Sequence, residues 1–154
     1  MTLGISIVAV GRLRPGPERD LYQHYAGRIR WPLTVHEVEE RRHLPTESMI
    51  AREGELLRAA CPKGARIVAL DRTGTALTSE ALARRLGAWR DEAVDDVALV
   101  IGGADGLDRS LVAAADLVLS FGAVTWPHLL MRALVAEQVY RAQQILAGHP
   151  YHRS

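Results

Sequence analysis

Cysteine and lysine are almost absent from the sequence. Cys61 is the only cysteine and Lys63 the only lysine among 154 residues. A single thiol can form no disulfide within the chain and cannot supply a cysteine-rich zinc site, a usage typical of a protein in a reducing cytoplasm. The other basic residues are arginines, whose planar fork binds two oxygens of a phosphate or carboxylate at once.

The sequence also lacks an excess of charge and a long apolar run. Its 19 basic and 18 acidic residues give a formal net charge of +1, so a nucleic acid would have to bind a local patch. The longest stretch without Asp, Glu, Lys or Arg, Leu117 to Met131, is shorter than the about 20 residues of a membrane helix. No basic region precedes the apolar start, Leu3 to Val10. We therefore expect a soluble, cytoplasmic protein without a signal peptide or membrane span.

Hydrophobic periodicity predicts strands that alternate with helices. Short apolar runs typical of strands occupy Leu3–Val10, Thr34–Val38, Arg66–Leu70, Val97–Ile101 and Leu117–Leu119. Apolar residues at helical spacing occupy Glu18–Ile29, Thr46–Ala60, Ser79–Ala93, a segment from about Asp108, and Pro127 to about Leu146. Continuous apolar strands separated by helices indicate an α/β fold, a parallel sheet between two helical layers. The length fits a single domain over residues 1–154.

Three segments follow predicted strands and should line one crevice, because ligands of parallel sheets bind beyond the carboxyl ends of the strands. They are Leu70–Gly74, Gly102–Gly106 and Ser120–His128. The glycine-rich motif, Ile101 to Gly106, has neither the phosphate-loop nor the dinucleotide pattern, and by itself it is more typical of a tight turn. Because two other loops lie at the same edge of the sheet, we expect it to form the floor of a ligand site. The third segment is too apolar to be left in water, so it buries itself, contacts a second subunit or forms the wall of a ligand pocket.

Polar residues that could take part in a reaction lie on the last predicted helix and in the segment after it. His128 and Arg132 are four residues apart and share one side of its first turns, while Glu137 and Arg141 have the spacing of a surface ion pair. The helix is otherwise apolar over much of its surface, which favours a homodimer. The chain ends in His149–Ser154, where an aromatic ring, two imidazoles and a guanidinium suit stacking on a base and pairing with a phosphate. Two histidines without an acidic or cysteine partner make an incomplete ligand set, so no metal site is predicted.

Together these motifs resemble those of the RlmH family, small SPOUT methyltransferases, along the whole chain. The matching segments, in order, are the opening at Ile5–Arg14, EGE at Glu53–Glu55, LDRTG at Leu70–Gly74, IGGADGL at Ile101–Leu107, TWPHLLMR at Thr125–Arg132, LVAEQVYRA at Leu134–Ala142 and the terminal HPYHR at His149–Arg153. The last three are the most specific. Ala104-Asp105 in the glycine loop and Trp126 depart from the commoner residues but leave the glycines intact.

The resemblance implies a C-terminal trefoil knot, S-adenosylmethionine as methyl donor, and a homodimer that completes each site. It further implies methylation of N3 of pseudouridine 1915 in helix 69 of 23S ribosomal RNA, on the assembled ribosome. The cofactor-binding residues that it implies are Leu70, Gly103, Gly122, Ala123, Val124, Thr125, Trp126 and Pro127. These residues belong to the three segments that the sheet argument selects.

The implied reaction needs a group that receives the N3 proton and a cation that stabilises the resulting charge. We assign the first task to His128 or His152, and the second to Arg132 or Arg153. Tyr151 would stack on the target base. Arg12, Arg14 and neighbouring arginines would contact the RNA.

Two other functions are compatible with the sequence. The chain could be a nucleotide-binding module of flavodoxin-like type without catalysis, with the IGGADG segment as a phosphate cradle. It could also be a ribosome-associated dimer that performs no chemistry. Titration with S-adenosylmethionine and with flavin separates the first from an enzyme, and transfer of labelled methyl to ribosomes separates the second.

Removing Tyr151 to Ser154 tests the role of the tail. The truncated protein should bind S-adenosylmethionine nearly as well as the full chain, by calorimetric titration, but should methylate no RNA. An unimpaired truncated enzyme would overturn the assignment of the tail to the target nucleotide.

Overall fold

The computed structural model describes residues 2–152, in which five parallel strands form one sheet of order β2-β1-β4-β3-β5. Strand β4 therefore lies at the centre of the sheet, and β2 and β5 form its two edges. The strands are β1 (Gly4–Val10), β2 (Leu33–Val38), β3 (Arg66–Thr75), β4 (Asp96–Ile101) and β5 (Leu117–Leu119).

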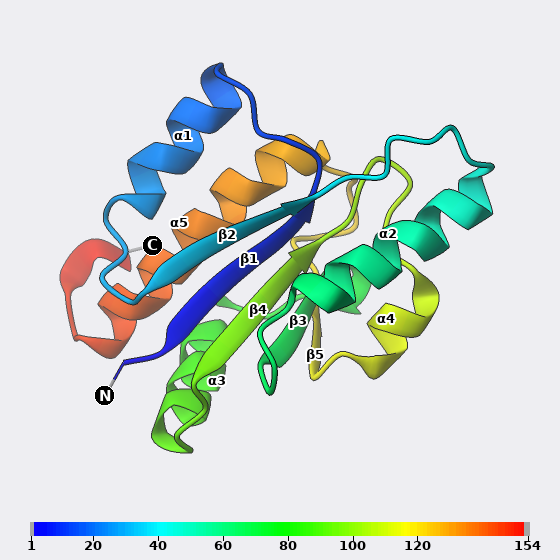
Figure 1. Ribbon diagram of the computed structural model, residues 1–154. Coiled ribbons are helices and arrows are strands. Elements are labelled where there is room, and N and C mark those ends of the chain that lie inside the picture. Colours follow the sequence, from blue (N-terminus) through cyan, green and yellow to red (C-terminus); the bar gives the residue numbers. More distant parts are fainter. Residues whose placement is uncertain (1, 153–154) are drawn as a thin grey trace.

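Helices cover both faces of the sheet and confirm the predicted three-layer α/β architecture (Figure 1). One face carries α1 (Pro17–Ala26), α3 (Ser79–Asp91) and α5 (His128–Leu146), with α5 packed between the other two. The other face carries α2 (Thr46–Ala60) and α4 (Arg109–Ala114). A 3-10 turn, η1 (Pro150–His152), returns from the end of α5 and packs against it.

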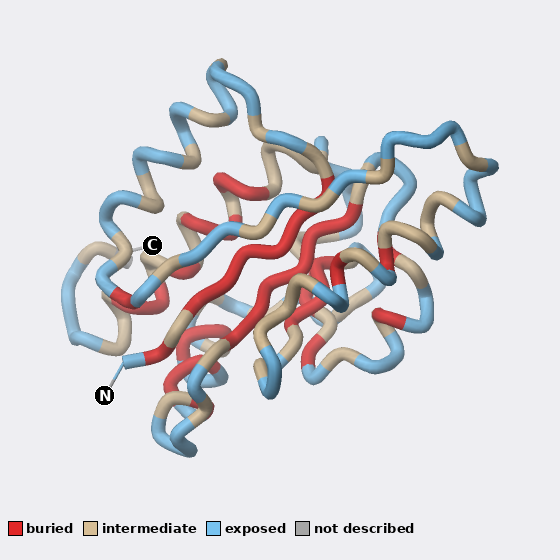
Figure 2. Tube along the Cα trace, viewed as in Figure 1, coloured by how far each residue is buried: buried red, intermediate tan, exposed pale blue. Residues whose placement is uncertain are grey.

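Burial of β1 shows why its sequence is a continuous apolar run. Ile5, Ile7 and Ala9 belong to the cluster under α3 and α5, whereas Val8 and Val10 belong to the cluster under α2 and α4. Successive side chains of a strand point to opposite faces, so a strand covered on both sides is apolar at nearly every position; in β1 the buried exception is Ser6. Figure 2 shows the buried path along β1 and β4, beside the more exposed edge strand β2.

Most boundaries of the predicted elements lie within two residues of those observed, and two differ by more. Strand β3 continues to Thr75, five residues beyond the predicted end, because a register shift lets both Leu70 and Thr75 pair with Leu119 of β5. Helix α1 ends at Ala26 instead of Ile29, since the chain turns at Gly27.

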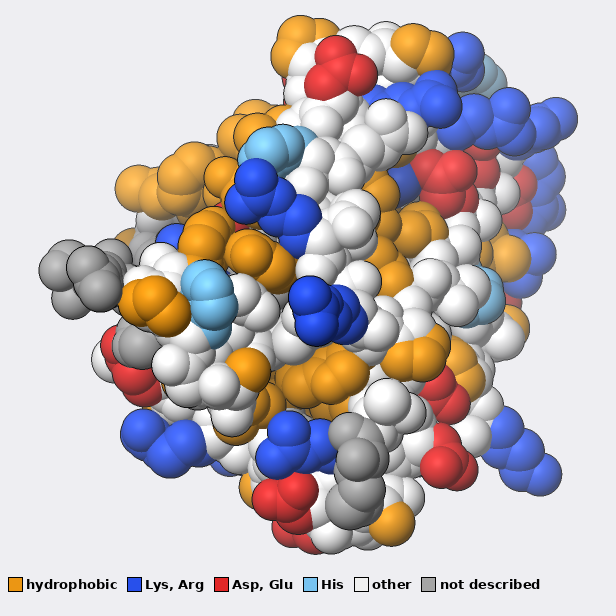
Figure 3. Space-filling view, turned by 90° about the vertical axis from the view of Figure 1, so that its left-hand side faces the viewer, with side chains coloured by type: hydrophobic (Ala, Val, Ile, Leu, Met, Phe, Trp, Pro, Cys, Tyr) orange, Lys and Arg blue, Asp and Glu red, His pale blue; other side chains and the backbone are white. Residues whose placement is uncertain are grey.

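Acidic and basic side chains share the surface, in agreement with the near-neutral composition. Figure 3 shows acidic, basic and hydrophobic side chains interspersed on one face, with basic side chains gathered at its upper right. No helix within residues 2–152 is long and apolar enough to cross a membrane.

Candidate active site

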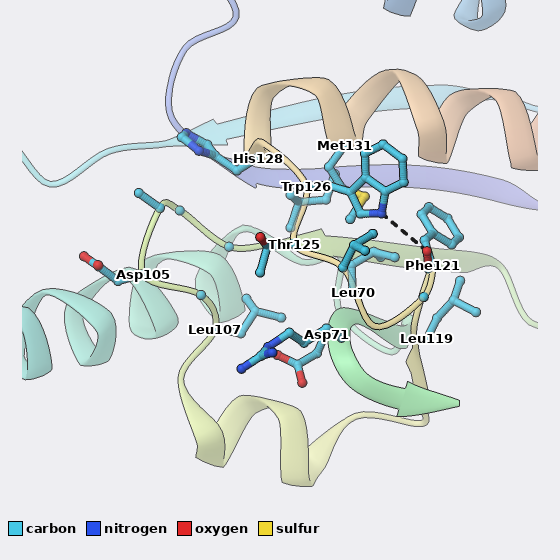
Figure 4. A pocket seen from close by; sticks show the side chains of 18 residues that line it. Leu70, Asp71, Asp105, Leu107, Leu119, Phe121, Thr125, Trp126, His128 and Met131 are labelled. Carbon is cyan, nitrogen blue, oxygen red and sulfur yellow. Dashed lines mark hydrogen bonds between the residues drawn. The ribbon is translucent and has the colours of Figure 1, made fainter. Parts of the chain in front are cut away.

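A cavity of about 280 Å³ opens where the carboxyl ends of β3, β4 and β5 meet, as predicted from the strand pattern. In Figure 4, His128 and Asp105 lie at one end of it, and Phe121 and Leu119 at the other. All three predicted segments contribute to its wall. The residues that line it are Leu70, Asp71, Arg72, Ile101, Gly102, Gly103, Ala104, Asp105, Gly106, Leu107, Leu119, Phe121, Gly122, Val124, Thr125, Trp126, His128 and Met131.

The structure brings most of the expected cofactor-binding residues together. Those that line the cavity are Leu70, Gly103, Gly122, Val124, Thr125 and Trp126; Ala123 and Pro127 do not line it. Ile101, the first residue of the predicted floor, lines the cavity, but sequence reasoning missed the apolar side chains of Leu107 and Met131. A signal for Leu107 is its position directly after the glycine segment.

Close backbone packing explains the glycines of the floor. A methyl group on Gly102 would lie 2.8 Å from the carbonyl carbon of Gly106, so the loop can close on itself only without a side chain there. Gly106 has a φ of +86°, a conformation that glycine adopts without strain. The amide of Gly106 donates to the carbonyl of Gly103 at 3.1 Å, which fixes the turn.

The apolar loop is held in shape by its own hydrogen bonds. The Trp126 indole donates to the carbonyl of Phe121 at 3.3 Å, the interaction drawn in Figure 4. The Ser120 hydroxyl accepts from the amide of Gly122 at 3.1 Å. Even so, Val124 and Trp126 remain 62% and 41% exposed. A preformed apolar loop left this open is suited to cover a ligand or a second protein.

His128 is the titratable imidazole of the cavity. It is half-buried, and burial together with the nearby charge of Arg132 lowers its pKa below the ordinary value. The imidazole is therefore neutral near pH 7 and able to receive a proton. Its Nε2 lies 3.7 Å from the position that a side chain on Gly11 would occupy, so it borders the end of β1 as well as the cavity.

Arg132 does not line the cavity, although the sequence places it beside His128. Its side chain is 1% exposed, and one guanidinium nitrogen donates to Glu37 Oε2 at 2.5 Å. Another donates to the carbonyl of Gly11 at 2.5 Å. The guanidinium thus fastens α5 to the ends of β1 and β2, and it does not belong to the lining of the cavity.

The tail lies at the other end of α5. The Tyr151 hydroxyl donates to Glu137 Oε2 at 3.0 Å, and its ring packs edge-on against Tyr140 and under the Arg141 guanidinium. Burial and the hydrogen bond to Glu137 raise the pKa of Tyr151 to about 12. The structure includes the backbone of His152 in η1, but the side chain of His152 and the whole of Arg153 lie outside the described residues.

One carboxylate of the cavity, that of Asp71, is paired with an arginine. Asp71 accepts hydrogen bonds from the Arg109 guanidinium at 2.7 Å and from the Thr73 amide at 3.1 Å. Chiefly because of Arg109, the pKa of Asp71 falls from 3.8 to about 2. Asp105 forms no ion pair within the described residues, which leaves a carboxylate at the His128 end.

A family description and several relatives match the chain. The model of the family described as "Predicted SPOUT methyltransferase" matches residues 3–152. A protein of Rhodospirillum centenum named ribosomal RNA large subunit methyltransferase H is 59% identical over 148 residues, covering 96% of this chain and 97% of that protein. Proteins of the same name from Rhodospirillum rubrum and Roseobacter denitrificans are 56% and 49% identical, covering 96% and 97% of this chain, and 97% and 99% of their own lengths.

A solved structure shares the fold at low sequence identity. The SpoU methyltransferase AviRb from Streptomyces viridochromogenes, solved in complex with the cofactor AdoMet, superposes with a TM-score of 0.50 and 13% identity. The match covers 92% of this chain and 58% of that chain. Together with the family match, it supports the fold class expected from the motifs.

The Asp71–Arg109 pair predicts how stability depends on pH. The pKa of Asp71 is lower in the folded chain than the ordinary value of 3.8. Its carboxylate therefore stabilises the fold fully at pH values above 3.8, and this contribution is lost as the pH falls towards about 2. The free energy of unfolding of Asp71→Asn should therefore be lower than that of the wild type at neutral pH, and the difference should shrink on acidification. Urea denaturation at a series of pH values measures it.

The matched control is Asp91→Asn, which removes a 66% exposed carboxylate paired with Arg90. Exposed pairs contribute little, so this variant should differ less from the wild type at neutral pH. A difference for Asp71→Asn that stays constant across the acid range would contradict the depressed pKa.

Proposed function

This chain belongs to the SPOUT methyltransferase family, as a member of its RlmH group, and from that premise we propose that it is a 23S ribosomal RNA methyltransferase that uses S-adenosylmethionine. The target that we propose is N3 of pseudouridine 1915 in helix 69, on the assembled ribosome. The observation that carries the proposal is the preformed cavity at the carboxyl edge, because six of its lining residues are those that the family resemblance implies for the cofactor: Leu70, Gly103, Gly122, Val124, Thr125 and Trp126.

The cavity has the chemistry that this cofactor needs. Apolar side chains of Leu70, Ile101 and Met131 offer walls for an adenine ring, and the glycine turn exposes backbone groups that can contact polar parts. The unpaired carboxylate of Asp105 suits a cofactor that carries positive charge on its sulfonium and ammonium groups. No metal is needed for this set of contacts.

Catalysis by these residues is chiefly positioning and proton transfer. S-adenosylmethionine supplies an already activated methyl group, and holding the acceptor nitrogen in line with it can contribute about 7 to 11 kcal/mol. Among the side chains of the cavity, His128 is placed to receive the imide proton, because its imidazole is neutral and borders the opening. Arg132 supports this role indirectly, since it lowers the pKa of His128 and holds the neighbouring backbone.

The position of the tail favours a homodimer. Glu137, which holds Tyr151, is nine residues after His128 along α5, or about 14 Å along the helix axis. Tyr151, held there, does not line the cavity of its own chain. We propose that a second copy completes each site and brings Tyr151, His152 and Arg153 to the target nucleotide, as the family resemblance implies.

Transfer of labelled methyl from S-adenosylmethionine to ribosomes tests the proposal most directly. Ribosomes that lack the modification should accept the label, and nucleoside analysis should find it on N3 of one pseudouridine of 23S rRNA. Binding of S-adenosylmethionine without transfer would favour a non-catalytic module, and label on another nucleotide would refute the proposed target.

His128→Asn tests the proposed proton acceptor in the same assay. We expect kcat to fall by about 100-fold or more, as for loss of a general base, with little change in the affinity for S-adenosylmethionine. The control is His24→Asn on α1, whose side chain is exposed and lies outside the cavity. Equal activity of both variants would exclude His128 as the base.

A further inference from the structure

A second cavity, of about 450 Å³, lies at the same edge of the sheet, beyond the ends of β1 and β2. We call it the arginine groove. The residues that line it and matter for its chemistry are Gly11, Arg12, Val35, Glu37, Glu39 and Arg41. Because the sheet order is β2-β1-β4-β3-β5, the groove and the cofactor cavity are neighbours along one edge.

The arginine groove carries free positive charge. The exposed side chains of Arg12 and Arg41 form no ion pair within residues 2–152. Of the two carboxylates, Glu37 is occupied: although burial opposes ionisation, hydrogen bonds from Arg132 and the Leu13 amide hold its pKa below the ordinary value. That leaves two guanidinium groups against the single carboxylate of Glu39, together with an exposed apolar side chain, Val35.

The groove and the cofactor cavity approach each other closely where β1 ends. Gly11 lines the groove, and His128, which lines the cavity, has its Nε2 only 3.7 Å from the position of a side chain on Gly11. One strand further along the edge, the Val10 side chain lies 3.1 Å from the corresponding position on Gly103. An extended chain lying in the groove can therefore reach the catalytic end of the cavity without crossing another element.

Buried hydrogen bonds fix the shape of the groove. Arg132 donates to the carbonyl of Gly11, and Glu37 accepts both from Arg132 and from the Leu13 amide at 2.7 Å. The loop that carries Arg12 is thus attached at both sides of this residue. A guanidinium on an anchored loop loses less freedom on binding than one on a mobile loop.

We propose that the arginine groove binds the sugar–phosphate backbone of the RNA substrate beside the methylated nucleotide, with Arg12 and Arg41 on phosphates. The inference rests on the proposed function, because it takes its ligand to be the RNA of that reaction. A guanidinium group can donate two parallel hydrogen bonds to two oxygens of one phosphate. The apolar surface of Val35 suits contact with a ribose. The groove binds and positions the RNA, and the reaction takes place in the adjoining cavity.

The test is the double variant Arg12→Gln with Arg41→Gln, compared with Lys63→Gln with Arg84→Gln. The control removes the same charge from exposed residues outside both cavities. We expect the groove variant to raise the KM for ribosomes about tenfold or more and to flatten its dependence on salt by about one to two phosphate contacts. Its kcat and its affinity for S-adenosylmethionine should stay close to those of the wild type.

A groove variant whose KM and salt dependence equal those of the control would overturn the proposal. Loss of S-adenosylmethionine affinity in the groove variant would also overturn it, because the groove would then belong to the cofactor site. Failure of the wild-type protein to methylate ribosomes would instead refute the proposed function, so the two failures are distinct.

Discussion

The arrangement of the site depends on one buried cation. Arg132 lies on α5 with 1% of its side chain exposed, and it reaches the carbonyl groups that end β1 and the carboxylate of Glu37 on β2. Burying a guanidinium is costly unless its charge and its hydrogen bonds are met, and removing one partner of such a pair costs about 3 to 5 kcal/mol. Within residues 2–152 only its Nε lacks a partner. The first turn of α5, which carries His128, is therefore fixed relative to two strands of the sheet.

The carboxyl edge of the sheet has two parts. Beyond β3, β4 and β5, apolar walls and a glycine turn line the proposed cofactor cavity; beyond β1 and β2, Arg12 and Arg41 line the proposed RNA groove beside Val35. His128 stands at the boundary as a neutral imidazole. The proposed RNA contact uses few charges, placed beside the proposed reaction site, which agrees with the net charge of +1.

Much of this could be predicted from sequence because strands buried on both faces leave a strong signal. The runs at Leu3–Val10 and Val97–Ile101 indicate a parallel sheet, and in such a sheet the loops that follow the strands meet at one edge. Contacts between segments far apart in the chain could not be predicted from the sequence. The spacing of His128 and Arg132 implied one shared polar face, whereas a partner 95 residues away, Glu37, draws Arg132 inward. The hydrogen bond from Tyr151 to Glu137 likewise joins two residues that no sequence pattern pairs.

Hydrogen exchange with and without S-adenosylmethionine tests directly whether the cavity beyond β3, β4 and β5 holds the cofactor. The cofactor should slow amide exchange in three separate stretches, residues 70–74, 101–107 and 119–126, and leave the arginine groove at residues 11–14 and 35–41 nearly unchanged. Protection centred on the groove, or no protection in any of the three stretches at saturating cofactor, would contradict it.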